Sequence, residues 1–513
     1  MPTRRLQKTD RIIIIGAGAF GLSTSLHLAL RGYKNVIVFD RHDYEASKYD
    51  YRSGAESASS GMSDSSIDIL PHNTFSLTCR NFIKDLNKII RSAYGSQVEY
   101  QDLSKEAIEW WTAWNEEIKN GNDLPPGLDS SDRVYINNGT LSFTDKDELA
   151  SFELDTIRNM EAAGLAGTQL VTMNPQHVEA AEKRGVGYGI DPFRRKERGK
   201  GNVGVLDTTG GVVVADKACR FALHKARALG VKFVFDAQAG AFESFWYDKV
   251  GKVIGVKMQN GERHKADKVV MACGGWTPSL IPELDGLCET TCGSVIMLKI
   301  PRDSPLFVRF SPERFPSWMW QLWDGAEGGL YGFPRDDLGW MKIGYRGTKY
   351  TNPQVQPDGK VRSVPITRYT PGDKITHIPE RAMKVFKHFL AEYLPEMAES
   401  GIDIELTRLC WYTDSFDNHY VVDDIPGQDT VMVATGGSGH AFKYLPNIGK
   451  WIVDIMEGVG LERTLVQRWR WRELQAGEKP FNVLMEGSGS ARALQNVAWS
   501  KDSDLKLGTR PRL

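Results

Sequence analysis

The hydrophobic and polar positions of residues 11–40 predict a strand, a glycine-rich turn, a helix and a second strand. Four isoleucines at positions 12–15 form the first apolar run, and the sequence Gly-Ala-Gly-Ala-Phe-Gly follows at 16–21. Leucines at helical spacing continue to position 30, and a second apolar run at 36–39 ends on Asp40. Short apolar runs around an amphipathic helix are typical of a parallel sheet buried on both faces.

The glycine turn has the spacing of a dinucleotide-binding fingerprint. Gly16 permits the tight turn, Gly18 lets the backbone approach a pyrophosphate, and Gly21 lets helix and strand pack closely. Free N–H groups at the start of the helix favour phosphate, and Asp40 suits ribose hydroxyls but repels the 2′-phosphate of NADP. The alternative is a glycine turn that binds nothing. The residues expected to contact the cofactor here are Gly16, Ala17, Gly18, Ala19, Phe20, Gly21, Asp40 and Arg41.

A second literal match to this fingerprint, at residues 199–204, is not expected to bind a nucleotide. It follows the charged run 194–198 instead of an apolar strand, and no helical pattern comes after it. We interpret it as a solvated loop. Its rejection removes the second dinucleotide site that an NADPH-dependent flavin monooxygenase would need.

Two later segments are predicted to return to the domain that the fingerprint opens. Apolar strands at 268–273 and 431–435 each run into a pair of glycines, as the strand at 12–15 does. Three such strand ends predict one discontinuous cofactor domain. Period-2 strands such as 341–345 predict an antiparallel sheet that caps the cofactor. The expected ranges are 10–105, 205–285 and 405–480 for the cofactor domain, 106–204 and 286–404 for the substrate domain, and 481–513 for a tail.

FAD fits this organisation better than NAD does. The fingerprint would serve the adenosine end, and the turn Gly436–Gly439 could serve the flavin ring. A helix N-terminus after that turn would stabilise negative charge on the reduced ring. NAD enzymes commonly have one fingerprint in a continuous Rossmann domain, which this chain lacks.

Composition and charge exclude several classes of binding partner. The 513 residues carry a net charge of −1, which gives no basic footprint for nucleic acid. No apolar run approaches the ~20 residues of a membrane span, and the first ten residues contain no secretory apolar core. The six cysteines complete no zinc site. We therefore expect an intracellular protein, cytoplasmic or peroxisomal, that is a monomer or weak homo-oligomer without metal.

Four motifs together resemble the covalent-FAD amine oxidases, the group of monomeric sarcosine, pipecolate, saccharopine and fructosyl amino acid oxidases. These motifs are Ser59-Ser60, Asp85–Arg91, Cys410–Asp423 and Gly437–Lys443. The resemblance covers about residues 10–475, and fungal amino acid oxidases of the fumisoquin type are its nearest expected members. It implies a Rossmann-like FAD-binding domain of the D-amino-acid-oxidase type, α/β with antiparallel β, capped by a mixed-sheet substrate domain.

The resemblance also implies roles for single residues. Cys410 would carry the flavin through an 8α-S-cysteinyl bond, although the residue pattern alone indicates a buried structural cysteine. Lys88 would lie near the flavin and help dioxygen reduction, because a cation stabilises superoxide; a solvated helix lysine is the alternative. Arg91 and Lys443 would bind the substrate carboxylate, with a surface position as the alternative for Arg91. Arg472 resembles a late carboxylate-binding arginine. The remaining expected cofactor contacts are Ser59, Ser60, Asp85, Lys88, Gly437, Gly439, Phe442 and Lys443.

The implied activity is oxidation of a secondary or N-alkylated amino acid to an imine or iminium ion, with dioxygen reduced to hydrogen peroxide. In fungal secondary metabolism a phenol of the same substrate could capture the iminium. A flavin dehydrogenase, a fructosyl amino acid oxidase and an inactive FAD-binding scaffold are the alternatives. The stretch Trp318–Asp324 has apolar residues where the fructosyl branch has an acid, which favours an aromatic or flat apolar amine.

Residues 61–84 interrupt the Ser-Ser and Asp-x-Asn-Lys motifs with a polar, patternless stretch. Gly61-Met62-Ser63 can encode a fungal splice donor, and Lys84-Asp85 can encode an acceptor whose use restores aspartate. We predict that this segment is a translated intron of about seventy nucleotides; the alternative is a genuine surface loop, since a loop insertion costs little closure entropy. Sequencing the transcript across the junction should show the spliced form. Transcripts that all retain the segment, with loss of FAD on its deletion, would contradict the intron.

Overall fold

The three glycine-ended strands lie side by side in one six-stranded sheet of the computed structural model, which describes residues 6–42, 87–121, 123–322, 324–367, 370 and 375–508. All neighbours in this sheet are parallel except the edge pair β21–β22. In spatial order the sheet contains β21 Val421–Ile425, β22 Gln428–Thr435, β13 Lys268–Met271, β1 Arg11–Ile15, β2 Asn35–Asp40 and β9 Lys232–Phe235. We call this sheet and its covering elements the cofactor unit.

Both faces of the six-stranded sheet are covered, which explains its unbroken apolar strands. Ile12 and Ile14 pack toward a helical layer, while Ile13 and Ile15 pack toward a small antiparallel meander. The helical layer consists of α1 Ala19–Leu30, α6 Ala215–Ala228 and α11 Ile448–Glu457; the meander consists of β10 Phe242–Tyr247, β11 Val253–Met258 and β12 Arg263–Lys265. Gly449 of α11 donates its N–H to the Ser23 hydroxyl of α1 at 2.7 Å, so these two helices approach closely.

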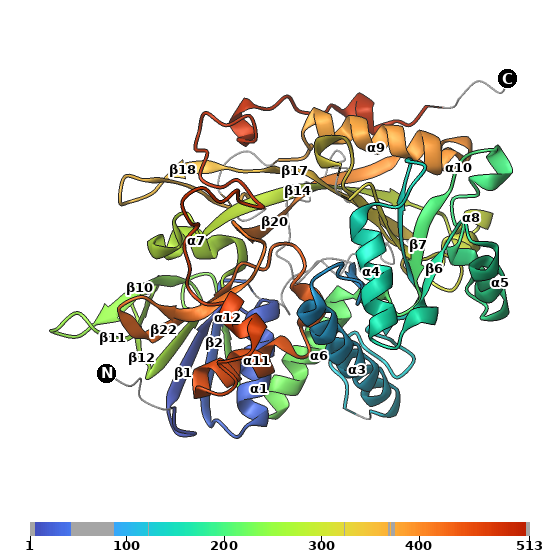
Figure 1. Ribbon diagram of the computed structural model, residues 1–513. Coiled ribbons are helices and arrows are strands. Elements are labelled where there is room, and N and C mark those ends of the chain that lie inside the picture. Colours follow the sequence, from blue (N-terminus) through green and yellow to red (C-terminus); the bar gives the residue numbers. More distant parts are fainter. Residues whose placement is uncertain are drawn as a thin grey trace, which may run out of the picture.

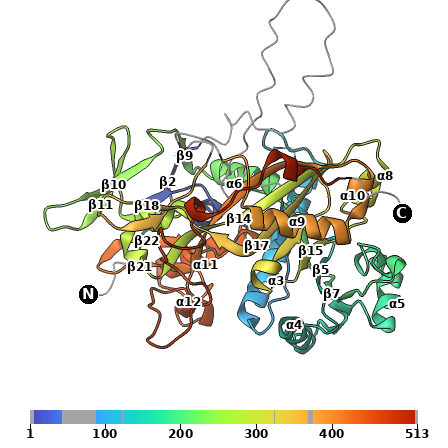
Figure 2. The same cartoon turned by 90° about the horizontal axis from the view of Figure 1, so that it is seen from above.

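An eight-stranded sheet forms the second unit and lies above the cofactor unit in Figure 1. Its neighbours are antiparallel apart from the parallel pair β15–β5, as the expected mixed sheet requires. In order it contains β20 Ile404–Ser415, β14 Cys288–Lys299, β17 Trp340–Tyr350, β16 Leu330–Gly332, β15 Ser317–Trp320, β5 Thr140–Thr144, β7 Val203–Asp207 and β6 Gln169–Val171. Figure 2 shows α9, Glu380–Tyr393, lying across this sheet.

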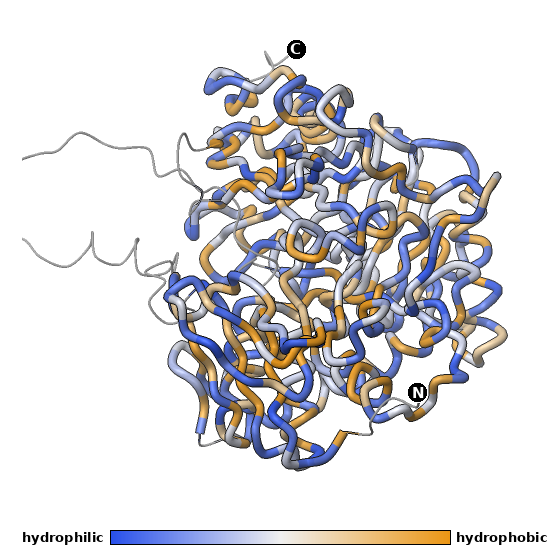
Figure 3. Tube along the Cα trace, turned by 90° about the vertical axis from the view of Figure 1, so that its left-hand side faces the viewer, coloured by the Kyte–Doolittle hydropathy of each residue, from blue (hydrophilic) through white to orange (hydrophobic). Residues whose placement is uncertain are grey.

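Two tryptophans of the stretch Trp318–Asp324, Trp318 and Trp320, belong to the core. The side chains of Trp318 and Trp320 are fully buried in the core of the eight-stranded unit, and Trp318 stacks on Phe389 of α9 with ring centroids 4.6 Å apart. The alternation of the strand sends Met319 to the opposite side, where it lines the central cavity. Figure 3 shows apolar segments gathered inside each unit and polar segments at the outer turns.

Two local predictions differ from the structure. The second glycine match at 199–204 is a loop only as far as Asn202, because β7 begins at Val203 and pairs with β5 and β6. The segment before α6 forms β8, Gly211–Val214, which joins a separate three-stranded sheet with β3 Asn87–Ile90 and β4 Tyr135–Ile136. Lys88 therefore lies on a strand, which excludes the solvated-helix alternative.

The remaining elements complete the two units. The other helices are α3 Val98–Asn120, α4 Ser151–Ala162, α5 Pro175–Lys183, α7 Thr277–Leu280, α8 Pro305–Arg309, α10 Pro395–Glu399 and α12 Thr464–Arg468, and β18 Pro353–Val355 pairs with β19 Val361–Ser363. Within the described ranges, every helix is too short or too polar to span a lipid bilayer. Ser59, Ser60, Asp85 and the segment 61–84 lie outside the described residues.

Candidate functional site

The fingerprint turn at the end of β1 is built for close backbone approach. Gly16 has φ +100, and a Cβ there would lie 2.4 Å from the carbonyl oxygen of Ala272. A Cβ on Gly21 would lie 1.9 Å from the Gly16 carbonyl oxygen. The N-cap of α1 is Gly18, which makes no side-chain cap, and the first turn contains no acid. The start of α1 thus offers N–H groups and positive potential to an anion.

A groove extends from this turn across the carboxyl ends of β1, β2, β13 and β22. Its lining includes Asp40 and Arg41 at one end and Gly437 and Phe442 at the other. The Asp40 carboxylate accepts hydrogen bonds from the N–H of Ala17 at 2.9 Å and from the following turn at 3.0 Å, which orients it into the groove mouth. The glycine backbone at both ends of the groove fits a dinucleotide such as FAD.

A central cavity of about 430 Å³ continues from the groove, and Phe442 borders both. Residues of both units line it: Lys88, Ile89, Arg91, Tyr94, Gln97, Phe152, Met319, Leu322, Gly325, Tyr331, Phe333, Arg346, Gly347, Lys349, Cys410, Tyr412, Asn418, Ser438, Gly439, His440, Phe442, Lys443, Phe481 and Asn482. The structure therefore brings the predicted Lys88, Arg91, Cys410, Gly439 and Lys443 to one cavity. Its volume suits a small molecule.

Cys410 lies on β20 at the wall of this cavity. Its side chain is buried and makes no disulfide. Directly across the ladder is Gly293 of β14, which presents no side chain beside the thiol. Tyr412, two residues along the same face, places its hydroxyl 2.8 Å from where a Gly293 Cβ would stand. Cys410 lines the central cavity together with Ser438 and Gly439 of the turn after β22.

The turn after β22 differs from the predicted strand–turn–helix. Ser438 has a left-handed φ of +45, and a short 3-10 turn, Phe442–Tyr444, follows the glycines. α11 does not begin until Ile448. The helix expected after this turn is therefore present as α11, but its N-terminus lies at Ile448 and not directly after the glycines that were expected to meet the flavin ring.

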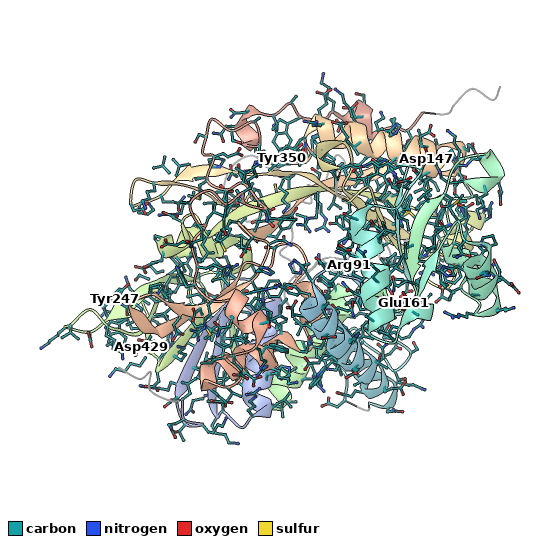
Figure 4. The ribbon with its side chains drawn as sticks, in the orientation of Figure 1. Arg91, Asp147, Glu161, Tyr247, Tyr350 and Asp429 are labelled. Carbon is teal, nitrogen blue, oxygen red and sulfur yellow. The ribbon has the colours of Figure 1, made fainter. Side chains whose placement is uncertain are left out.

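Arg91 and Lys443 meet at one end of the cavity, on the ring of Tyr94. The Arg91 guanidinium carbon lies 5.4 Å from that ring centroid and 5.2 Å from the Phe152 centroid, and the Lys443 ammonium lies 4.6 Å from the Tyr94 centroid. Among the described residues, buried Nη1 of Arg91 has no hydrogen-bond partner. Figure 4 shows Arg91 near the middle of the molecule, between the two units.

Burial lowers the pKa of Lys443 well below its usual value. The neighbouring charge of Arg91 adds to this effect, while Asp207 opposes it. An anion bound between Arg91 and Lys443 would relieve the repulsion and favour the charged ammonium. We call Arg91, Lys443 and the Tyr94 ring between them the first cationic pole.

His440 lies between the cations of the cavity and is held neutral. Its Nε2 donates to the carbonyl oxygen of Asn418 at 3.0 Å, so Nδ1 accepts from the hydroxyls of Tyr420 at 3.0 Å and Tyr94 at 3.1 Å. Burial lowers the pKa of His440 well below its usual value, and nearby lysine and arginine side chains add to the effect. His440 is thus a fixed acceptor that positions Tyr94.

Sequence reasoning missed a second group of charged residues, on β17. Arg346 has its guanidinium carbon 4.9 Å from the Tyr412 ring centroid, and its Nη2 donates to the Ser438 carbonyl oxygen at 3.1 Å. Lys349 forms an ion pair of 3.1 Å with Asp414, a carboxylate that is fully buried behind the cavity wall. Burial lowers the pKa of Lys349 to about 8. The only signal in the sequence was the alternation of side chains along the β17 strand, and this alternation does not show which face of the strand meets the cavity.

Lys342, also on β17, is a further missed cation. Its side chain is fully buried, and its Nζ donates to the carbonyl oxygen of Asn87 at 2.6 Å. Asn87 immediately precedes Lys88, whose ammonium lies 5.8 Å from the Phe442 ring centroid. Two lysines from different sheets, Lys342 and Lys88, therefore lie at or beside the β3 backbone.

The structure does not bring Arg472 to the cavity. Its guanidinium forms a bidentate pair with Asp417, with both distances 2.6 Å. The remaining donors go to the carbonyl oxygens of His419, Tyr420 and Arg470. All three nitrogens are thus engaged within the protein, and the predicted substrate role of Arg472 has no support in this geometry.

Comparisons with known proteins agree with this architecture. Residues 11–455 match the family described as DAO, FAD dependent oxidoreductase. The L-saccharopine oxidase of Schizosaccharomyces pombe is 28% identical over 476 residues, 90% of this chain and 93% of that protein. The monomeric sarcosine oxidase of Bacillus sp. strain B-0618 is 23% identical over 447 residues, 86% of this chain and 90% of that protein. The fructosyl peptide oxidase from E. terrenum superposes with a TM-score of 0.72 at 23% identity, covering 98% of this chain and 100% of that one, which confirms the expected fold class.

Proposed function

The chain belongs to the DAO family of FAD-dependent oxidoreductases, and we propose that it is an oxidase of secondary or N-alkylated amino acids. The observation that carries this proposal is the first cationic pole inside a small cavity next to the cofactor groove. Arg91 and Lys443 together match an amino acid carboxylate, and charge-assisted hydrogen bonds to such a group are strong and directional. The relatives named as saccharopine and sarcosine oxidases act on amino acids with substituted nitrogens, which agrees with this choice.

The positive charge of the cavity also favours the neutral form of the substrate amine. Among the described residues that line it, five are lysine or arginine and none is aspartate or glutamate. Such a surrounding raises the free energy of a substrate ammonium and favours the neutral amine, whose lone pair is needed for oxidation. Neutral His440 adds no opposing charge. The chain therefore requires no separate general base at the amine.

FAD supplies the redox chemistry, taking two electrons from the C–N unit of the substrate to leave an imine or iminium and passing them to dioxygen to give hydrogen peroxide. The fingerprint turn and Asp40 would hold its adenosine end, and Cys410, which lines the central cavity, would form the thioether at its ring. Lys88, which lines the central cavity, would stabilise the negative charge that develops on dioxygen. A phenol on the substrate could then capture the iminium, as in a pathway of secondary metabolism.

The fructosyl amino acid oxidase reading is weaker, although the fold is shared with a fructosyl peptide oxidase. No described lining residue offers a carboxylate to a sugar hydroxyl or a protonated amine. A glycated amino acid would therefore lack its strongest acceptor in this cavity. The test is direct: N-methyl and cyclic amino acids should be oxidised at higher kcat/KM than fructosyl amino acids of the same side chain.

Air reoxidation separates an oxidase from a dehydrogenase. After anaerobic reduction by substrate, the flavin should be reoxidised by dioxygen with stoichiometric peroxide, as followed by stopped-flow absorbance. Lys88→Met should slow that step about tenfold or more, because one cation is lost where negative charge develops. The partly exposed Lys105, which pairs with Asp102 on α3 and does not line the cavity, provides the control Lys105→Met. Equal reoxidation rates in Lys88→Met would remove Lys88 from the oxygen step, and no reoxidation by air in the unmutated protein would reject the oxidase.

A further inference from the structure

A small cavity of about 20 Å³ lies beside Arg91. Arg91, Phe152 and Met319 line both this cavity and the central one. The rest of its lining comes mainly from α4, β5, β6 and β7, and it includes Gln169 and Asp207. The cavity therefore lies where Arg91, which follows β3, meets the eight-stranded sheet. We call it the rear cavity.

Three residues of the rear cavity each have a buried polar atom without a hydrogen-bond partner in the described part of the chain. These atoms are Nη1 of Arg91, Oε1 of Gln169 and Oδ2 of Asp207. Gln169 and Asp207 are 2% and 3% exposed, and they lie opposite each other in the β6–β7 ladder. A buried polar atom left without a partner is costly, so three of them in the lining of one cavity indicate a shared ligand.

The two oxygens of Asp207 have different surroundings. Oδ1 accepts three hydrogen bonds, from Nε2 of Gln169 at 2.9 Å and from the N–H and the hydroxyl of Thr209 at 3.0 and 2.6 Å. Oδ2 is the oxygen that accepts none from the described residues. Because a buried carboxylate is stable only when its charge is compensated by hydrogen bonds or a cation, Oδ2 needs a donor. Asp207 is therefore held by one oxygen and has the other available.

The size and polarity of the rear cavity match one water molecule. A buried site needs roughly 10–15 Å³ and two to four polar partners to hold a water. A water oxygen can accept from Nη1 of Arg91 while its two hydrogens are donated to Asp207 and Gln169, which satisfies all three atoms at once. The charge of Arg91 disfavours a cation in this place, and the charge of Asp207 disfavours an anion.

We propose that one ordered water occupies the rear cavity and joins Arg91 to Asp207 and Gln169, so that Asp207 acts through this water as a positioning residue for the substrate carboxylate. The inference rests on the proposed function, in which Arg91 and Lys443 bind that carboxylate. A guanidinium fixed through Nη1 keeps its orientation, and its other donors remain for the central cavity. Burial and then Arg91 lower the pKa of Lys443 and Asp207 opposes them, so the charge of Asp207 also acts on the first cationic pole.

A crystal structure of the FAD-loaded enzyme, at a resolution that shows ordered waters, tests the site directly. One water should lie within hydrogen-bond distance of Nη1 of Arg91, Oδ2 of Asp207 and Oε1 of Gln169. Direct pairing of Arg91 with Asp207, or a rear cavity that contains no water, would overturn the proposal. This result does not depend on turnover.

Two substitutions of opposite size at Val205, which lines the rear cavity on β7, test the role of the water. Val205→Ile adds a methylene group and should expel the water. Binding of acetate, which cannot be oxidised here, should then weaken roughly tenfold as followed by flavin absorbance, because Nη1 of Arg91 loses its partner. Val205→Ala enlarges the cavity, keeps the water and should leave the acetate affinity unchanged. Equal weakening in both variants would assign the effect to packing and reject the positioning role.

Asp207→Asn tests the charge, because the amide oxygen can keep the hydrogen bonds that Oδ1 accepts. The pKa of Lys443 should fall further without this carboxylate, so acetate affinity should begin to decrease at a lower pH than in the unmutated protein. Asp102→Asn, exposed on α3, is the control. Coinciding pH profiles for Asp207→Asn and the unmutated protein would remove Asp207 from the site. If no amine reduces the flavin but the water is present and Val205→Ile weakens acetate binding, the proposed reaction fails and the water site stands.

Discussion

Cys410→Ser protein is expected to release all of its flavin on acid precipitation, whereas the unmutated protein should give a yellow pellet. The thiol borders the central cavity, and Gly293 opposite it leaves that face of the ladder without a cross-strand side chain. A serine hydroxyl in the same place cannot form the thioether. The expected change is complete, because a covalent bond survives acid and noncovalent contacts do not. Absorbance of the pellet and supernatant, with the intact mass of the protein, measures it.

Two other cysteines make this test specific. Cys292→Ser, on β14 and fully buried, should leave the pellet yellow. Cys273 lines the cofactor groove and is the competing attachment site. A yellow pellet from Cys410→Ser together with a colourless one from Cys273→Ser would move the linkage to Cys273. A colourless pellet from the unmutated protein would show that FAD is held without a covalent bond.

Lys443→Met is expected to weaken substrate binding by roughly ten- to a hundredfold. Hydrogen bonds to charged groups contribute about 1.5–3 kcal/mol, and the ammonium of Lys443 provides one partner of the carboxylate. The loss should appear mainly in the Kd of a nonreactive carboxylate and in KM, with a smaller change in the rate of flavin reduction at saturation. Lys450→Met is the matched control, because that lysine is exposed and pairs with Glu106 outside the cavity. An unchanged Kd in Lys443→Met would reject its role.

The same residue predicts a pH dependence. Burial and Arg91 lower the pKa of Lys443, so its ammonium is fully present only below that lowered value. Carboxylate affinity should be highest below this pKa and should fall about tenfold per pH unit above it, until the pKa of the complex is reached. Lys443→Met should flatten this profile, as measured by flavin absorbance titrations across pH. A profile that keeps its slope in the mutant would assign the proton to another group.

Local patterns predicted the elements around the cofactor groove. The four isoleucines of β1, the glycine turn and Asp40 lie within thirty residues of one another, and short-range sterics and burial decide their structure. The strands that end at Gly274 and Gly436 were recognised by the same local signal, and they do lie beside β1.

The position of Arg346 in the central cavity could not be predicted in this way. Arg346 reaches the cavity because β17 pairs with β14 in one register and because Gly439, more than ninety residues later, has no side chain. A slip of one residue in that register would have turned Arg346 away from the cavity. Arg472 was assigned from a motif alone, and its engagement by Asp417 depends on a long-range contact that the motif does not contain.

The short connection from β20 to β21 affects how rigidly the two sheets are held together once FAD is bound. β20 ends at Ser415 on the edge of one sheet, and β21 begins at Val421 on the edge of the other. Arg472 holds the connecting segment between these two strands by binding its residue Asp417. If a flavin is bonded to Cys410 on β20 and its nucleotide end is bound by the turn after β1, the cofactor would connect the two sheets. Separating the two sheets would then strain the bound cofactor, so loading with FAD is expected to stiffen the connection between β20 and β21.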